Sequence, residues 1–168
     1  CKRAVRAAGE LGVQYLTLFG FSTENWSRPA DEIKELMRLL RVYLRAETAE
    51  LHRNNIRIQM IGERDAFADD VMELIENAET LTKDNDGLYL TIALNYGGRD
   101  EIVRAASDMA LFMKEKGINP DFAAAQEYFT SFLFTKDMPD PDILIRTSGE
   151  QRISNFLLWQ CAYTEFIY

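Results

Sequence analysis

The sequence has few cysteines, histidines and prolines, and each scarcity excludes a class of protein. Among 168 residues there are two cysteines, Cys1 and Cys161, one histidine and four prolines. Two cysteines at opposite ends, without a CxxC spacing, indicate neither a disulfide framework nor a zinc site. The single histidine, His52, cannot form a histidine metal cluster, and without a GxSxG motif it does not indicate a serine hydrolase. We expect it to be a residue at a helix end.

Long apolar runs are also missing. No stretch approaches 18 apolar residues, and the beginning, CKRAVRAAGE, lacks the apolar core of a signal peptide. We therefore expect a cytoplasmic protein. With 47% hydrophobic and 27% charged residues the composition is that of a globular protein, and the length predicts one domain over residues 1–168.

Positive charge is scarce too. The chain carries 27 acidic and 19 basic residues, a net charge of −8, which disfavours general binding of nucleic acid. Thirteen of the basic residues are arginines, whose planar guanidinium suits bidentate contacts with phosphate. The positions of the arginines are therefore more informative than their number.

Apolar periodicity predicts alternating strands and helices. The expected strands cover residues 13–21, 56–61, 88–94 and 143–145, with an aromatic strand at the end, and the expected helices cover 2–10, 31–53, 65–82, 99–116 and 121–131. The almost continuous apolar run at 13–21 is typical of a strand buried on both faces. The pattern predicts an α/β fold with a mainly parallel central sheet flanked by helices.

Polar loops follow three of these strands: FSTENWSR, NYGGR and RTSGEQRIS. In parallel sheets, ligands bind beyond the carboxyl ends of the strands. Arg146, Arg152 and the hydroxyl groups between them could hold a diphosphate, or both arginines could pair with surface carboxylates. The glycines of NYGGR could admit a phosphate to a helix N-terminus or simply turn the chain, and the second alternative is favoured. The sequence contains neither GxGxxG nor GxxxxGK[ST].

Two chemically reactive residue types, a cysteine and a glutamate, lie in aromatic segments near the end of the chain. Cys161 lies in FLLWQCAY and is expected to be a packing residue and not a nucleophile. Glu165 is a lone acid in YTEFIY, where it could bind a metal or lie exposed on an edge strand.

Three segments together resemble a known family. FSTENWSRP (21–29), NYGGRDEI (95–102) and DPDILIRTSGEQRISNFLLWQCAYTE (140–165) resemble the bacterial undecaprenyl diphosphate synthases, of the cis-prenyltransferase family, and the similarity covers essentially the whole chain. The resemblance implies that isopentenyl diphosphate is added with cis geometry to farnesyl diphosphate. The product would be a long-chain polyprenyl diphosphate, the lipid carrier of cell-wall synthesis, delivered at the membrane surface. It also implies Mg²⁺ as cofactor, a homodimer, and an apolar tunnel between the sheet and two helices.

The resemblance implies roles for single residues. Asn25 matches the residue assigned as proton acceptor, although a neutral amide is a very weak base and more plausibly orients the substrate or a water molecule. Glu165 would be a metal ligand, either within its own subunit or across the dimer. The substrate-binding residues would be Ser22, Thr23, Glu24, Trp26, Arg28, Arg146, Arg152, Ile153 and Ser154. The tunnel would be lined near Gly20 and by Leu36, Met37 and Leu40, which could equally be plain core.

The family pattern extends beyond this sequence at both ends. Its aspartate motif, similar to MDGNGRWA, would precede Cys1, and its arginine- and glycine-rich tail would follow Tyr168. We therefore expect a fragment of a catalytic domain that is inactive alone. The alternatives are a non-catalytic partner subunit of a prenyltransferase and an unrelated phosphate-binding enzyme such as a nucleotide hydrolase.

Overall fold

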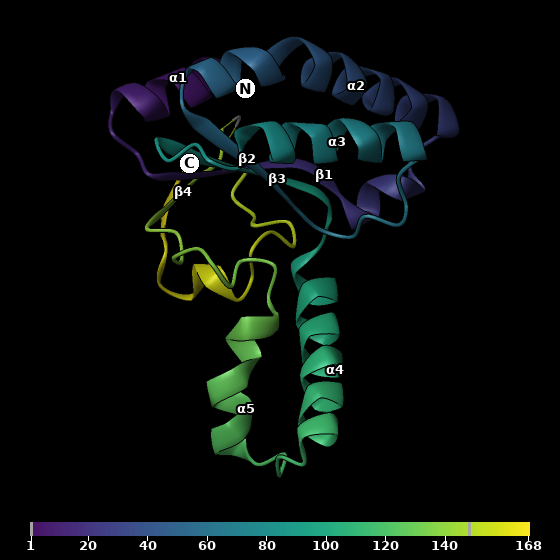
Figure 1. Ribbon diagram of the computed structural model, residues 1–168, viewed down its shortest axis with the longest axis vertical. Coiled ribbons are helices and arrows are strands. Elements are labelled where there is room, and N and C mark those ends of the chain that lie inside the picture. The colour runs from purple at the N-terminus through teal and green to yellow at the C-terminus, as the bar shows by residue number, and fades with distance from the viewer. Residues whose placement is uncertain (1, 148) are drawn as a thin grey trace. The chain divides into compact units, whose positions relative to one another are not determined.

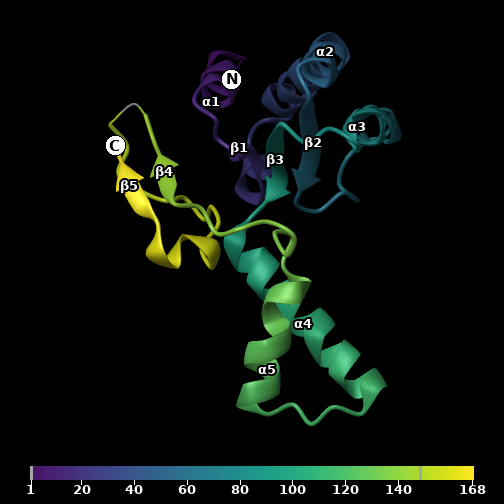
Figure 2. The ribbon, with the colours of Figure 1, turned by 60° about the vertical axis from the view of Figure 1, so that its left-hand side comes forward.

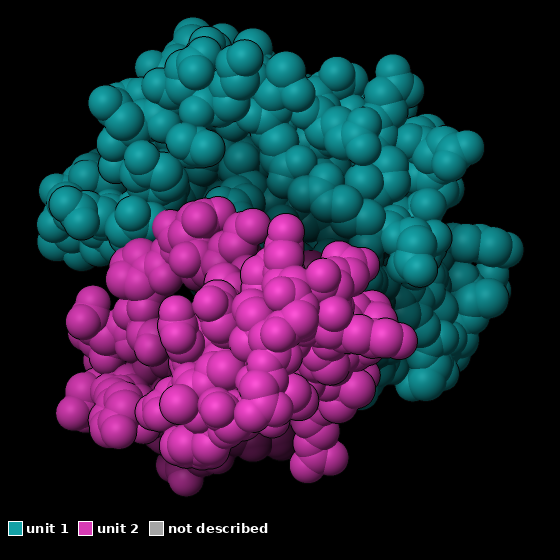
Figure 3. All heavy atoms as spheres, turned by 60° about the horizontal axis from the view of Figure 1, so that its bottom comes forward, with its two compact units in different colours: residues 1–95 teal, residues 96–168 magenta. Residues whose placement is uncertain are grey.

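The computed structural model describes residues 2–147 and 149–168, in two compact units formed by residues 1–95 and residues 96–168 (Figures 1 and 3). The first contains α1 (Lys2–Glu10), β1 (Tyr15–Ser22), η1 (Thr23–Ser27), α2 (Ala30–Arg53), β2 (Ile56–Ile61), α3 (Asp69–Thr82) and β3 (Leu88–Tyr96), of which Tyr96 already belongs to the second unit. The second contains α4 (Gly98–Lys116), α5 (Phe122–Tyr128), η2 (Phe129–Phe132), β4 (Ile143–Ile145), η3 (Gln160–Tyr163) and β5 (Glu165–Ile167).

The first unit is built on a three-stranded sheet in the order β1-β3-β2. β2 and β3 are parallel, with Ile56 paired to Leu88 at one end and Ile61 to Ala93 at the other. β1 runs in the same direction, since its beginning stacks on the beginning of β3 through Tyr15 and Tyr89, with ring centroids 5.0 Å apart. Its end correspondingly lies against the end of β3. Figures 1 and 2 show α2 and α3 on one side of this sheet.

Helix α2 forms where the sequence predicts it. Pro29 occupies its N-cap, Asp31 and Glu32 lie in its first turn, and His52 and Arg53 lie in its last. Acidic residues at the N-terminus and cations at the C-terminus favour the helix dipole. The inward face of α2 packs against α3 and β2. The most deeply buried core residues lie on β3 and α3 and include Leu90, Ala93 and Ile75.

Three sequence expectations need correction. β1 is an edge strand and is not buried on both faces: Tyr15 remains 38% exposed and Phe19 36% exposed. The helix expected from residue 65 begins at Asp69, after a turn in which Phe67 N donates to Arg64 O. The helix expected over residues 121–131 divides into α5 and η2. The first error arises because an apolar run does not distinguish an edge strand from a central one.

The second unit contains a two-stranded sheet, in which β4 and β5 are parallel and Ile143 is paired with Glu165. Helix α4 ends at Lys116 and is capped by Gly117, whose φ of 66° is in the left-handed region. Parallel strands with flanking helices confirm the predicted fold class. Among the helices of the described residues, none has the length and apolarity needed to cross a bilayer.

Candidate functional site

Asn25, the predicted catalytic residue, lies in the turn after β1, where a backbone N–H of the same turn holds its side chain. The backbone N of Ser22 donates a hydrogen bond of 2.9 Å to Asn25 Oδ1. Because this bond engages the amide oxygen, the NH₂ group is the part of Asn25 suited to contact a ligand. The arrangement favours orientation of a ligand over proton abstraction.

Trp26 in the same turn is joined to the end of β3. Its indole Nε1 donates to Asn95 Oδ1 at 2.7 Å, and its ring contacts Phe21 edge-on, with centroids 5.0 Å apart. Asn95 is 6% exposed, and its Nδ2 donates to the carbonyl of Glu63 at 3.0 Å. One side chain thus connects the segments that follow β1, β2 and β3. The sequence analysis did not single out Asn95, although NYGGR contains it.

The other predicted residues of this turn lie near the solvent. Glu24 and Arg28 are exposed, and Arg28 Nη1 lies 3.6 Å from Glu32 Oε2. Thr23 Oγ1 donates to Glu24 Oε2 at 3.4 Å. The turn therefore combines hydroxyl, carboxylate, amide and guanidinium groups at the end of one strand.

In the second unit, Arg146 organises the loop after β4. Its Nη1 donates to the backbone carbonyl of Arg152 and, at 2.8 Å, to Ser154 Oγ. Arg152 forms an ion pair with Glu150. The structure brings Arg146, Arg152 and Ser154 together in one loop, and their predicted role in binding a diphosphate stays a prediction; Ser148 lies outside the described residues. Ile153, between them, is half-buried.

The NYGGR glycines have a structural role in this unit. A Cβ on Gly98 would lie 2.8 Å from Leu158 Cγ and 3.1 Å from Asn155 O. The first amides of α4 already have partners, since Gly98 N donates to Asn155 O at 2.7 Å and Arg99 N to Asn155 Oδ1 at 2.8 Å. Asn155, which the sequence analysis missed, thus caps α4. The favoured alternative, that these glycines serve the chain path, is supported.

The loop adopts its shape in left-handed backbone conformations. Ser154, Asn155 and Leu157 have φ values of 51°, 61° and 44°. Such conformations cost on the order of 1–3 kcal/mol each in non-glycine residues and persist where surrounding contacts hold them. The contacts of Ser154 with Arg146 and of Asn155 with α4 provide that support.

A buried carboxylate lies behind this loop. Glu101 is 1% exposed and accepts hydrogen bonds from Tyr96 OH, from Gln160 Nε2 at 3.1 Å and from Phe134 N at 2.8 Å. Burial, followed by the negative charge of Glu101, raises the pKa of Tyr96 far above its usual range. Tyr96 therefore remains a donor, and Glu101 joins α4 to η3 and to the segment before β4. The sequence placed Glu101 in a helix without indicating its burial.

Glu165 and the arginine loop are at opposite ends of the β4–β5 sheet. It is exposed on β5 opposite Ile143, whereas Arg146 follows the other end of β4, three residues or about 10 Å further along the strand direction. Among the described residues, no three His, Cys, Asp or Glu side chains are grouped as a metal site. Glu165 alone can thus contribute one carboxylate to a metal ion.

The remaining chemistry-bearing residues behave as expected. Cys161 is 7% exposed, and burial raises the pKa of its thiol, which fits a packing residue. His52 lies exposed in the last turn of α2.

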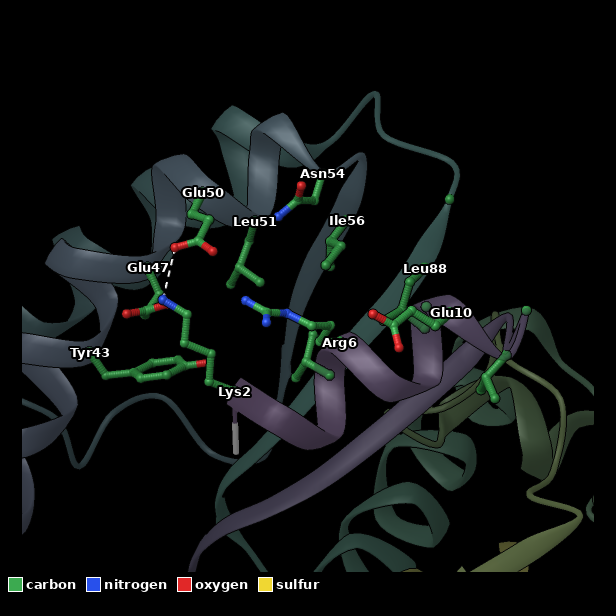
Figure 4. A pocket seen from close by; sticks show the side chains of 15 residues that line it. Lys2, Arg6, Glu10, Tyr43, Glu47, Glu50, Leu51, Asn54, Ile56 and Leu88 are labelled. Carbon is green, nitrogen blue, oxygen red and sulfur yellow. Dashed lines mark hydrogen bonds and ion pairs between the residues drawn. The ribbon is translucent and has the colours of Figure 1, made fainter.

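A pocket of about 600 Å³ lies in the first unit between α1, the end of α2 and the beginnings of β2 and β3 (Figure 4). Its apolar lining includes Val5, Leu51, Ile56 and Leu88. Lys2 closes one side through ion pairs with two glutamates of α2. Leu36, Met37 and Leu40, expected either to line a tunnel or to be plain core, are partly buried and pack against the core.

Polar groups beyond the carboxyl ends of parallel strands, including two arginines in one loop, are typical of α/β proteins that bind anionic ligands. A family model described as "Putative undecaprenyl diphosphate synthase" matches residues 1–168, and the chain belongs to this prenyltransferase family.

The relatives support this assignment. The isoprenyl transferase of Agrobacterium fabrum is 51% identical to this chain, and that of Brucella suis is 52% identical. Both alignments cover 99% of this chain. The chain spans 67% and 65% of their lengths, or about two thirds. A probable undecaprenyl diphosphate synthase from Campylobacter jejuni superposes with a TM-score of 0.85 at 37% identity, covering 98% of this chain and 76% of that one. Lavandulyl diphosphate synthase from Lavandula x intermedia, in complex with dimethylallyl diphosphate, gives 0.89 at 35% identity, with 96% and 70% covered.

Proposed function

We propose that this chain belongs to an enzyme with a prenyl transfer activity that adds isopentenyl diphosphate, with cis geometry, to farnesyl diphosphate. The product would be a long-chain polyprenyl diphosphate of the undecaprenyl type, used as a lipid carrier in cell-wall synthesis. One observation carries the proposal: Arg146, Arg152 and Ser154 share a loop beyond β4 in a chain about half identical to isoprenyl transferases.

The arginine loop would bind the diphosphate of isopentenyl diphosphate. Arg146 is already held by its bonds to the backbone of Arg152 and to Ser154, so little side-chain entropy would be lost on binding. A charge-assisted hydrogen bond to an oxyanion is about twice as strong as a neutral one. For Arg152, the diphosphate would replace or join Glu150, whose ion pair with it is largely exposed.

Asn25 would orient the reacting end of a substrate. Its oxygen is held by Ser22 N, so its NH₂ group donates. The neighbouring Thr23, Glu24 and Arg28 would add polar contacts, and Trp26 would hold the turn against β3 through Asn95.

The donor set is compatible with Mg²⁺ at Glu165. Magnesium is usually bound by one or two carboxylates together with substrate phosphates and water, so a single exposed glutamate fits that role. When bound, the ion would neutralise charge that develops on a departing diphosphate.

A homodimer is part of the same proposal. The two-stranded β4–β5 sheet keeps Ile143 54%, Ile145 69% and Ile167 50% exposed. An apolar patch of this kind is typical of an interface between subunits.

The proposal is tested by incubating the full-length protein with farnesyl diphosphate, radiolabelled isopentenyl diphosphate and Mg²⁺. We expect elongated prenyl diphosphates from it and none from residues 1–168 alone. Release of phosphate without elongation would instead identify a hydrolase. Binding of isopentenyl diphosphate without turnover, restored by adding an active homologue, would identify a partner subunit.

A further inference from the structure

Positive charge is concentrated in two segments of this acidic chain. Residues 2–10 hold three basic residues and one acid, and residues 36–53 hold four arginines and two acids. These segments carry a net charge of +4 in a chain whose net charge is −8; three acids and one lysine in the first six residues of α2 reduce the total for α1 and the whole of α2 to +2. The remainder of the chain is correspondingly more acidic.

The two helices present this charge together. Lys2 Nζ lies 2.8 Å from Glu47 Oε2 and 2.8 Å from Glu50 Oε2, which places α1 beside the end of α2 (Figure 4). The pKa of Glu50 is lowered mainly by Lys2 and further by the charges of Arg6 and Arg53. Both acids of this part of α2 are therefore compensated by Lys2, while Arg6 and Arg53 approach the same carboxylate from different helices.

The outward face of α2 is basic toward its C-terminal end and partly apolar. Residues 31, 35, 38, 42, 45, 49 and 53 follow the three- and four-residue spacing of one helix face and are all exposed. Asp31 and Glu35 make the beginning of this face acidic, and Glu35 forms an ion pair with Arg38. The end of the face, in contrast, carries only Arg45 and Arg53 as charged residues. Leu39 is 49% exposed and Val42 52% exposed on the same side. Within the described part of the chain, no acidic side chain forms an ion pair with Arg3, Arg45 or Arg53.

We propose that this face, formed by α1 and the outward side of α2, docks on the surface of a bilayer that contains anionic lipids. A helix with basic residues beside exposed apolar side chains lies in the membrane interface, where anionic lipid attracts the cations. Because the rest of the protein carries a net negative charge, an anionic surface would attract this face and repel the remainder. The charge argument stands independently of the proposed function, whose lipid product explains why docking would be useful.

Flotation with vesicles tests this docking. The protein is expected to bind vesicles of equal parts phosphatidylglycerol and phosphatidylcholine, to bind pure phosphatidylcholine at least tenfold more weakly, and to dissociate as NaCl is raised. Each basic residue near an anionic surface contributes about fivefold to the partition coefficient. Arg3→Glu with Arg45→Glu should therefore reduce binding by about 25-fold or more.

Matched variants separate the face from net charge and from apolarity. Lys116→Glu with Lys136→Glu makes the same change of charge on exposed residues elsewhere and should reduce binding less than fivefold. Leu39→Gln with Val42→Gln should weaken binding more than Val103→Gln with Leu111→Gln, which alters residues at least as exposed on α4.

Three results would overturn the docking proposal. They are equal binding to both vesicle types, equal loss in the two charge-reversal variants, and salt-sensitive self-association through this face without vesicle binding. A separate measurement, isopentenyl diphosphate binding in vesicle-free buffer, tests the proposed function without testing docking. This binding should be unchanged in the Arg3→Glu, Arg45→Glu variant, so a failure of the docking proposal leaves the proposed function intact.

Discussion

The indole Nε1 of Trp26 donates a 2.7 Å hydrogen bond to Asn95 Oδ1 across 69 residues of sequence. The same asparagine donates to the carbonyl of Glu63 and accepts, through its own carbonyl, a bond from Glu63 N at 3.2 Å. The ends of three strands in the first unit are therefore tied to one small side chain. The turn that contains Asn25 depends on this tie for its position.

Asn95→Ala should destabilise the first unit by about 2–4 kcal/mol. It leaves the Trp26 indole N–H and the Glu63 carbonyl without this partner, and it replaces asparagine at a φ of 49°, where asparagine is better tolerated than alanine. Trp26→Phe, which keeps an aromatic ring but loses the donor, should cost about 1 kcal/mol. Urea unfolding measures both, with the exposed Asn119→Ala as control. Equal stability of all three variants would show that the hydrogen bonds of Asn95 do not stabilise the first unit.

How far the sequence predicts this site depends on whether its contacts are local. The helices expected at residues 2–10, 31–53 and 99–116 follow from short-range patterns and are found at these places, whereas the binding role of the loop with Arg146 and Arg152 stays a prediction. Asn95 and Glu101 were missed because most of their partners lie tens of residues away, and because neither burial nor a positive φ is visible in a polar residue's sequence neighbourhood. The roles of Asn25 and Glu165 in chemistry stay predictions.

The buried pair of Tyr96 and Glu101 predicts how stability changes at high pH. Because the folded state raises the pKa of Tyr96 above its unfolded value near 10, the native state retains a proton that the unfolded chain loses. The stabilisation is thus complete below pH 10 and falls as pH rises beyond it, by about 1.4 kcal/mol per unit for this one group. Tyr96→Phe should flatten the alkaline part of a curve of unfolding free energy against pH.

Tyr163→Phe is the control for this alkaline effect, since Tyr163 is 98% exposed. It should leave the curve unchanged. Tyr96→Phe should also lower stability at neutral pH by about 1–3 kcal/mol, because the Glu101 carboxylate loses one of its donors. An alkaline slope that is identical in both variants would show that Tyr96 does not retain its proton.

Replacement of Arg146 or Arg152 by alanine should weaken binding of isopentenyl diphosphate by about 1.5–3 kcal/mol, the usual contribution of a charge-assisted contact. Arg146→Ala should have the larger effect, because it also releases the backbone of Arg152 and Ser154. Titration calorimetry measures the affinity, with the exposed Arg45→Ala as control. Unchanged affinity in both site variants would remove this loop from the binding site.

Two substitutions of Asn25 distinguish orientation of a substrate from proton abstraction. Aspartate keeps an oxygen to accept from Ser22 N but lacks the NH₂ donors, and it is a stronger base than an amide. If Asn25 orients a substrate by donating, Asn25→Asp should leave stability within about 0.5 kcal/mol and reduce kcat/KM by about tenfold or more. If Asn25 accepted the proton, the aspartate should retain or exceed the native rate. Asn25→Ala, which lacks both groups, should lose rate and also stability, by about 1 kcal/mol for the turn bond. Steady-state kinetics and urea unfolding of both variants therefore distinguish three roles of Asn25: hydrogen-bond donor to the substrate, base, and purely structural residue.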